Sequence, residues 1–171
     1  MPMRDFTAVY DEHVWTVYGF FAYRLRSRAD AEDLTQQTFE RALRAWGRYD
    51  AERAAVSTWL MAIARNLLVD HLRADRRPWQ DPIEDVQDDA RLGVVDRHRL
   101  GLDPALERAL AQLGDREREL VALRYGGDLT GPEIAALTGL TLANVQQILS
   151  RALRRMRASL DAGRPAVKEA R

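Results

Sequence analysis

Side chains that can bind nucleic acid are spaced at helical intervals near the C-terminal end of the chain. Amide and hydroxyl groups can hydrogen-bond to base edges, and guanidinium groups can bind bases or backbone phosphates. This set of residues is Thr141, Asn144, Gln146, Gln147, Ser150, Arg151, Arg154 and Arg155. If they share one face of a helix, the pattern indicates a helix that reads DNA from a groove.

A pair of helices joined by a tight turn would present this set. Ile134, Ala135 and Leu137 give a short helix an apolar face, and Gly139 permits the positive φ that a tight turn requires. Thr141 can then cap the next helix. The apolar stripe of that second helix is formed by Val145, Ile148, Leu149 and Leu153. The pattern predicts a helix-turn-helix, and a helical hairpin in any all-α domain is the alternative.

Charge is unevenly distributed along the chain. The 171 residues include 26 basic and 26 acidic side chains, so the formal net charge is zero. Basic residues gather at Arg73, Arg76 and Arg77, and again over 151–157, whereas the stretch between them is acidic. The acidic residues are Asp81, Glu84, Asp85, Asp88 and Asp89. This distribution favours contact with nucleic acid at two separate places.

Several classes of protein are excluded by composition. The absence of cysteine excludes disulfides and thiolate metal sites. There is no apolar signal core at the start and no run near the roughly 20 apolar residues of a membrane span. We therefore expect a soluble, cytoplasmic protein that does not insert into membranes.

Apolar periodicity predicts helices throughout, with no alternating strand pattern. Helices are expected over about 6–25, over 30–46 with Asp30 as its cap and Leu34, Phe39 and Leu43 as apolar positions, and over 57–72. Prolines and glycines interrupt 78–104, and a second helical pattern then follows. The predicted fold is all-α: a helical domain over 1–77, an acidic flexible linker over 78–104, a helix-turn-helix domain over 105–160 and a disordered tail over 161–171.

Three segments in series resemble a known family. Residues 30–39 (DAEDLTQQTF) resemble the core-polymerase-binding segment of bacterial sigma factors, and 57–73 (STWLMAIARNLLVDHLR) are similar to their −10-reading segment. The C-terminal half, from 109–113 (ALAQL), is similar to the −35-reading domain. With only these two domains and a linker, the chain resembles an extracytoplasmic-function (ECF, group 4, sigma-70 superfamily) sigma factor over 6–77 and 105–158.

The resemblance implies a role in transcription initiation as a promoter-specificity subunit of RNA polymerase. The implied partners are core RNA polymerase, through the clamp helices of its largest subunit and its flap region, promoter DNA and an anti-sigma factor. No cofactor or metal is implied, and no constellation of residues indicates an enzyme: the histidines are scattered and there is no glycine-rich phosphate loop. His71 has no second metal ligand at a suitable spacing.

Polar residues at the start of the second helix form the expected polymerase-binding surface. By itself this acidic face would be typical of a solvated helix. With the resemblance, it is assigned to core polymerase. Its residues are Asp30, Glu32, Asp33, Gln36, Gln37 and Glu40, whereas Leu34 and Phe39 are expected to face inward.

The third helix is expected to bind the separated −10 strand, which needs cations for the backbone and surfaces for unstacked bases. Within the resemblance, Asn66 and Asp70 lie near an extruded base, and Arg73, Arg76 and Arg77 near phosphates. Trp59 is either a wedge at the duplex fork or, at its helical spacing with Leu60 and Ile63, part of the core. The candidate residues are Trp59, Arg65, Asn66, Asp70, His71, Arg73, Arg76 and Arg77.

The predicted −35-reading helix departs from the family. Most members have a basic residue after the position of Val145 and an arginine two positions further on, where this chain has Gln146 and Ile148. Glutamine can pair bidentately with adenine, so an unusual −35 sequence is one interpretation, with Ile148 extending the apolar stripe. A sigma-like decoy that binds an anti-sigma factor, or a plain helix-turn-helix repressor, are the alternatives.

Overall fold

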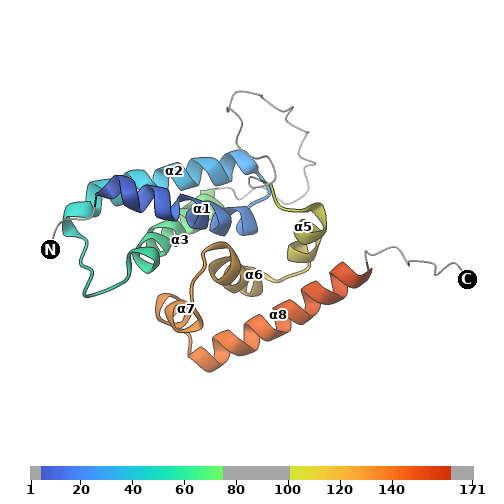
Figure 1. The fold of residues 1–171 in the computed structure, drawn as a ribbon. Coiled ribbons are helices and arrows are strands. Elements are labelled where there is room, and N and C mark those ends of the chain that lie inside the picture. The colour runs from blue at the N-terminus through green and yellow to red at the C-terminus, as the bar shows by residue number, and fades with distance from the viewer. Residues whose placement is uncertain (1–4, 75–100, 163–171) are drawn as a thin grey trace, which may run out of the picture.

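A computed structural model describes residues 5–74 and 101–162 (Figure 1). Within these ranges the chain is helical and contains no strand, as predicted. Arg76, Arg77, most of the acidic linker and residues 163–171 lie outside the described residues. The elements are α1 (Phe6–Arg24), α2 (Arg28–Ala45), the 3₁₀ turn η1 (Trp46–Arg48), α3 (Val56–Ala74), α5 (Pro104–Ala111), α6 (Asp115–Val121), the π-helical turn η2 (Ala122–Gly126), α7 (Gly131–Thr138) and α8 (Leu142–Ala162).

Helix α2 begins two residues earlier than predicted. Its N-cap is Ser27, whose hydroxyl accepts a 3.1 Å hydrogen bond from the backbone N–H of Asp30. The expectation that Asp30 is the cap was therefore wrong. A serine hydroxyl satisfies the exposed N–H groups equally well, and Asp30 instead places its carboxylate in the first turn, where the helix dipole favours it.

An aromatic cluster closes the end of the N-terminal three-helix bundle. The rings of Trp46 and Tyr49 are stacked with centroids 5.0 Å apart, and Trp59 of α3 lies 5.0 Å from Tyr49. The Tyr49 hydroxyl donates to the carbonyl of Ala54 at 2.9 Å. Trp59 is partly buried and packs against the core, as the core interpretation of this residue predicted.

The helix-turn-helix has the predicted turn and cap. Gly139 adopts φ 73°, in the left-handed region that favours glycine. Thr141 then accepts a 3.2 Å hydrogen bond from the backbone N–H of Asn144 at the start of α8. Val145 is fully buried and Ile148 is partly buried against the same core. The turn, the cap and these two positions of the stripe are confirmed, whereas Leu153, which was predicted to belong to the stripe, is exposed.

Glu133 joins the start of α7 to Thr130. Its carboxylate accepts hydrogen bonds from the Thr130 hydroxyl at 2.6 Å and the Thr130 backbone N–H at 2.8 Å. The hydrogen bond from the Thr130 hydroxyl, then that from its backbone, lowers the pKa of Glu133 below its ordinary 4.5. A depressed pKa contributes stability that is present above 4.5 and is lost as the pH falls through the folded-state value.

We therefore expect Glu133→Gln to lower the melting temperature at neutral pH, with the deficit disappearing on acidification below pH 4.5. Thermal unfolding of both proteins at matched pH values measures this. Glu107→Gln, an exposed carboxylate in the first turn of α5, is the control and should show no such convergence. If the melting temperature of Glu133→Gln stays lower than that of the unchanged protein at low pH, packing and not the charge of Glu133 is the cause.

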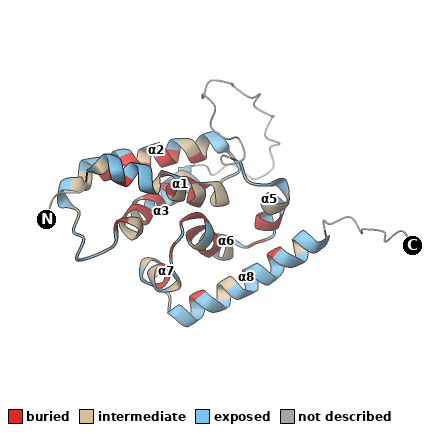
Figure 2. Cartoon of the chain, in the orientation of Figure 1, coloured by how far each residue is buried: buried red, intermediate tan, exposed pale blue. Residues whose placement is uncertain are grey.

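The two halves of the chain share one hydrophobic core, which the sequence did not predict. Leu120, Leu123 and Ile134 from the C-terminal half belong to the same buried cluster as Phe20 and Leu60 from the N-terminal half. In Figure 1, α1–α3 form one layer, and α6 and α7 lie between that layer and α8. Figure 2 shows the buried residues of both halves turned toward each other. The described residues therefore form a closed arrangement, a term used below for this packing.

Two glycines make the closed arrangement possible. A Cβ added to Gly126 would lie 2.5 Å from the carbonyl oxygen of Gly19 and 2.8 Å from the backbone nitrogen of Phe20. A Cβ on Gly19 would lie 2.7 Å from the Gly126 carbonyl oxygen. The backbones of α1 and η2 can thus approach this closely only when both residues lack a side chain.

Candidate nucleic-acid interface

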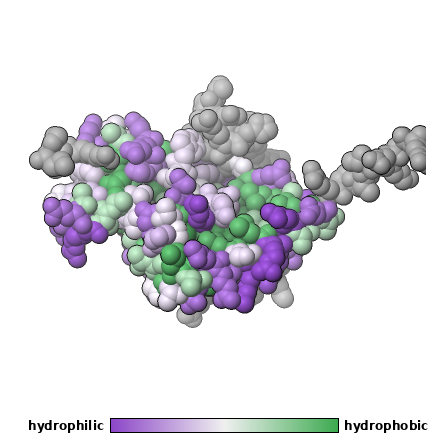
Figure 3. Space-filling model, turned by 60° about the horizontal axis from the view of Figure 1, so that its bottom comes forward, coloured by the Kyte–Doolittle hydropathy of each residue, from purple (hydrophilic) through white to green (hydrophobic). Residues whose placement is uncertain are grey.

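The outer face of α8 carries the predicted DNA-reading residues. All of them are exposed, whereas Val145, Ala152 and Met156 on the opposite side are buried. Figure 3, which brings the α8 side of the molecule forward, shows hydrophilic side chains interspersed with apolar ones over this surface. The exposed set is Thr141, Asn144, Gln146, Gln147, Ser150, Arg151, Arg154 and Arg155.

Arg155 also has a partner inside the molecule. Its guanidinium donates a 2.6 Å hydrogen bond to the carboxylate of Glu117 in α6. Its side chain keeps 53% exposure while that of Glu117 keeps 17%. The pair links α8 to α6, so a phosphate would have to compete with Glu117 for this arginine.

The candidate −10 residues on α3 do not all face solvent. Asn66, Asp70 and Arg73 are exposed. His71 is half-buried, with its Nε2 3.8 Å from a carboxylate oxygen of Asp30. Trp59 is held in the aromatic cluster described above.

Arg65 is engaged by the C-terminal half. Its Nε donates a 2.7 Å hydrogen bond to Glu119 of α6, and both side chains are largely buried, at 28% and 15% exposure. Nearby, the Thr58 hydroxyl donates to Glu133 of α7 at 3.2 Å. In the closed arrangement, α6 and α7 therefore occupy part of the surface that the sequence assigned to the −10 strand.

Helix α2 presents an ordered polar face. The Gln37 amide donates to Asp33 at 2.6 Å and the Gln36 amide donates to Glu40 at 3.0 Å. Near the start of the helix, Arg28 pairs with Glu32 at 2.9 Å. These i,i+4 contacts fix the side chains along the helix surface. Leu34 and Phe39 are buried, as expected.

Leu43 belongs to this polar face rather than to the core. It is 57% exposed, although the apolar pattern that predicted the helix included it. Asp33, Gln36 and Glu40 precede it at helical intervals, so Leu43 extends the same face toward the C-terminal end of α2. The exposure of Leu43 could not be predicted, because a leucine at helical spacing usually lies inside.

No group of three or more histidine, aspartate or glutamate residues in 5–74 and 101–162 could hold a metal ion. The helices of these ranges include none with the length and apolar character needed to cross a bilayer.

Comparison with known proteins identifies the family. The model of sigma-70 region 2 matches residues 9–78, and that of sigma-70 region 4 matches residues 109–158. The ECF RNA polymerase sigma factor RpoE of Cereibacter sphaeroides is 32% identical over 158 residues, covering 89% of this chain and 84% of that protein. The ECF sigma factor BldN of Streptomyces coelicolor is 31% identical, covering 87% of this chain and 58% of that protein.

A solved structure shows the same fold. The sigma factor RpoE of Bartonella quintana, crystallised with the anti-sigma factor NepR, superimposes with a TM-score of 0.73 at 23% identity, covering 94% of this chain and 99% of that one. The chain belongs to the extracytoplasmic-function family of RNA polymerase sigma factors.

Proposed function

We propose that this sigma factor uses three helical surfaces to bind core polymerase and promoter DNA. The polar face of α2 binds core polymerase, the α3 surface binds the separated −10 strand, and the outer face of α8 binds −35 DNA. The observation that carries this assignment is that regions 2 and 4 match in series and that α2 and α8 each expose a polar face. In this role the chain acts in the cytoplasm as a specificity subunit and carries out no catalysis itself.

The overall proposal is tested by run-off transcription. Purified chain is added to core polymerase on genomic fragments, and the start sites are mapped. We expect discrete transcripts that depend on the chain and share −10 and −35 sequences. Binding to core polymerase without any transcript would favour the decoy alternative, which the substitutions at Gln146 and Ile148 keep open.

Core binding depends, in this proposal, on the α2 face together with Leu43. Carboxylates on one ordered helix face suit a basic partner, and the exposed Leu43 at its end adds apolar area that such a partner would bury. The domain containing this face is assigned to residues 1–77, with the −35 domain over 105–160.

We expect Glu32→Lys combined with Asp33→Lys to weaken core polymerase binding by at least about tenfold while changing folding stability by only about 0.5 kcal/mol, because both positions lie on the polar face. Affinity measured with labelled core polymerase, alongside thermal unfolding, tests this. The control is Asp11→Lys combined with Glu52→Lys, which reverses two exposed charges away from α2. Equal affinity in the two double variants would place the polymerase interface elsewhere.

Binding to a promoter requires the closed arrangement to open. Glu119 holds Arg65 at 2.7 Å, so the −10 strand can reach this guanidinium only after α6 has moved away from α3. We also propose an anti-sigma factor as a partner, because the Bartonella quintana structural relative was crystallised with one. Such a partner would act by favouring one arrangement of the two halves over another.

A further inference from the structure

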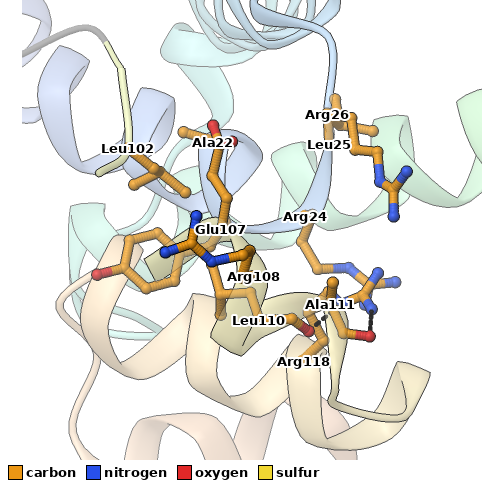
Figure 4. A pocket seen from close by; sticks show the side chains of 11 residues that line it. Ala22, Arg24, Leu25, Arg26, Leu102, Glu107, Arg108, Leu110, Ala111 and Arg118 are labelled. Atoms are coloured by element: carbon orange, nitrogen blue, oxygen red, sulfur yellow. Dashed lines mark hydrogen bonds between the residues drawn. The ribbon is translucent and has the colours of Figure 1, made fainter. Parts of the chain in front are cut away.

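A pocket of about 270 Å³ lies between the two halves, away from the three faces described above. Its walls come from the end of α1 and the residues after it, from α5 and from α6 (Figure 4). Ala22, Leu25, Leu102, Leu110 and Ala111 provide apolar surface. Small-molecule sites have this character, with mostly apolar walls and a few polar groups, and span roughly 300–1,000 Å³. At about 270 Å³ the pocket is slightly smaller than this range, so its volume suits only a small ligand and not a folded segment.

The charged residues that line the pocket are mainly arginines. Arg24, Arg26, Arg108 and Arg118 come from separate elements, and Glu107 is the one acidic residue among the lining residues. Burial lowers the pKa of Arg24 and that of Arg118, although the carboxylate of Asp115 opposes this shift for both groups, and that of Glu119 for Arg24. Each of the two guanidiniums also has a positive neighbour that lowers its pKa further, Arg118 for Arg24 and Arg26 for Arg118. Several guanidinium groups thus lie close together here, with the carboxylates of Asp115 and Glu119 as their negative neighbours.

The hydrogen bonds of Arg24 and Arg118 go to backbone carbonyls. Arg24 donates to the backbone carbonyl of Asp115 at 3.0 Å, while its Nε is buried with no hydrogen-bond partner. Arg118 donates to three backbone carbonyls at the end of α5. Within the described residues, no carboxylate accepts a hydrogen bond from either guanidinium, and the Arg108 side chain donates none. A buried donor without a partner is costly, and an anion would satisfy it.

We propose that this pocket binds a small phosphate-bearing ligand through Arg24, Arg108 and Arg118, with the apolar walls receiving the rest of the ligand. A phosphate group offers acceptor oxygens in several directions, which matches guanidinium groups that approach from three elements; a planar carboxylate matches one such fork. A nucleic-acid duplex is too large for the volume.

Because both halves line the pocket, the ligand would bind the closed arrangement in preference to an open one. A ligand with this preference shifts the population toward the closed form. It would thereby keep Arg65 paired with Glu119. This consequence for promoter binding rests on the proposed function, whereas ligand binding itself does not.

The test uses pyrophosphate and inorganic phosphate as probes with the full chain. Titration calorimetry should show saturable binding of one pyrophosphate per chain. Arg108 is exposed, so Arg108→Ala should not disturb folding. It should lower the affinity for pyrophosphate at least about tenfold, because one charge-assisted hydrogen bond is lost. Arg24→Lys, which keeps the charge but removes the Nε donor, should also weaken binding, and Arg44→Ala on α2 should not.

A second experiment measures the distance between the two halves directly. The chain has no cysteine, so Ala8→Cys and Ala158→Cys, both at exposed positions, can carry spin labels without background. Pyrophosphate should narrow the distance distribution between the labels. Equal affinity in Arg108→Ala and Arg44→Ala would overturn the proposal. So would the absence of saturable binding, or binding of a single-stranded oligonucleotide through Arg108 in place of pyrophosphate.

Discussion

Replacing Gly126 with alanine is expected to abolish the closed arrangement. The new Cβ would meet backbone atoms of Gly19 and Phe20 at 2.5–2.8 Å, and backbone on both sides cannot move aside as a flexible side chain can. Overpacking of this kind costs about 1–3 kcal/mol, and contact with backbone favours the upper end. The labels at positions 8 and 158 should then show a longer and broader distance distribution, and the melting temperature should fall.

Gly47→Ala is the matched control, since nothing lies within 4 Å of a Cβ at that position. Far-ultraviolet circular dichroism should show that both variants keep their helices. If opening frees Arg65, the Gly126→Ala chain should also bind a −10 single strand more tightly than the Gly47→Ala chain. An unchanged label distance in Gly126→Ala would mean that α1 and η2 can separate slightly without opening the molecule.

The second large effect concerns the −35-reading helix. Ile148 stands where the family resemblance leads us to expect arginine, and its side chain packs partly buried against the core below α8. We expect Ile148→Arg to destabilise the chain by about 2 kcal/mol, because a charge without a partner would be placed at the edge of this core. Promoter binding by the holoenzyme should not improve.

Gln146→Arg is the contrasting variant, because position 146 is exposed. It should leave the melting temperature unchanged and strengthen promoter binding by the holoenzyme about tenfold, the value of one charge-assisted contact. Differential scanning calorimetry and filter binding measure the two effects. A stable Ile148→Arg protein with tighter promoter binding would place Ile148 at the DNA surface. If neither variant gains affinity, the decoy alternative is favoured.

The structural features that the sequence predicted correctly depend on local chemistry. Gly139 and Thr141 affect the backbone only within a few residues of their own positions. Their residue types were therefore enough to place the turn and the cap. The cap of α2 was misplaced because Ser27 and Asp30 are both good cap residues, and only the backbone geometry decides between them.

The buried face of α2 shows a second limit. Thr35 and Thr38 are buried, and each donates its hydroxyl to the carbonyl four residues earlier, at 2.7 Å. This bond removes the cost of burying a hydroxyl, so polar residues occupy inward positions that a hydropathy pattern assigns to leucine. Leu43 is correspondingly left on the outer face.

The packing of the two halves could not be read from periodicity. It depends on the close approach of Gly19 to Gly126 and on the pairing of Arg65 with Glu119. In each pair the two residues are far apart in the sequence. Periodicity reports which face of a helix is apolar but not which distant helix covers it. For the same reason, the sequence assigns Arg65 to the −10 surface but does not reveal that Glu119 binds it.

The shared core has a consequence for synthesis of the protein. During translation, α1 leaves the ribosome roughly 100 residues before η2, which at about 5–20 residues per second is roughly 5–20 s. Throughout that interval, the side of α1 around Gly19 and Phe20 lacks the cover that the C-terminal half provides. The nascent chain therefore carries an apolar surface that either a chaperone or another nascent chain can reach before the protein has been completed.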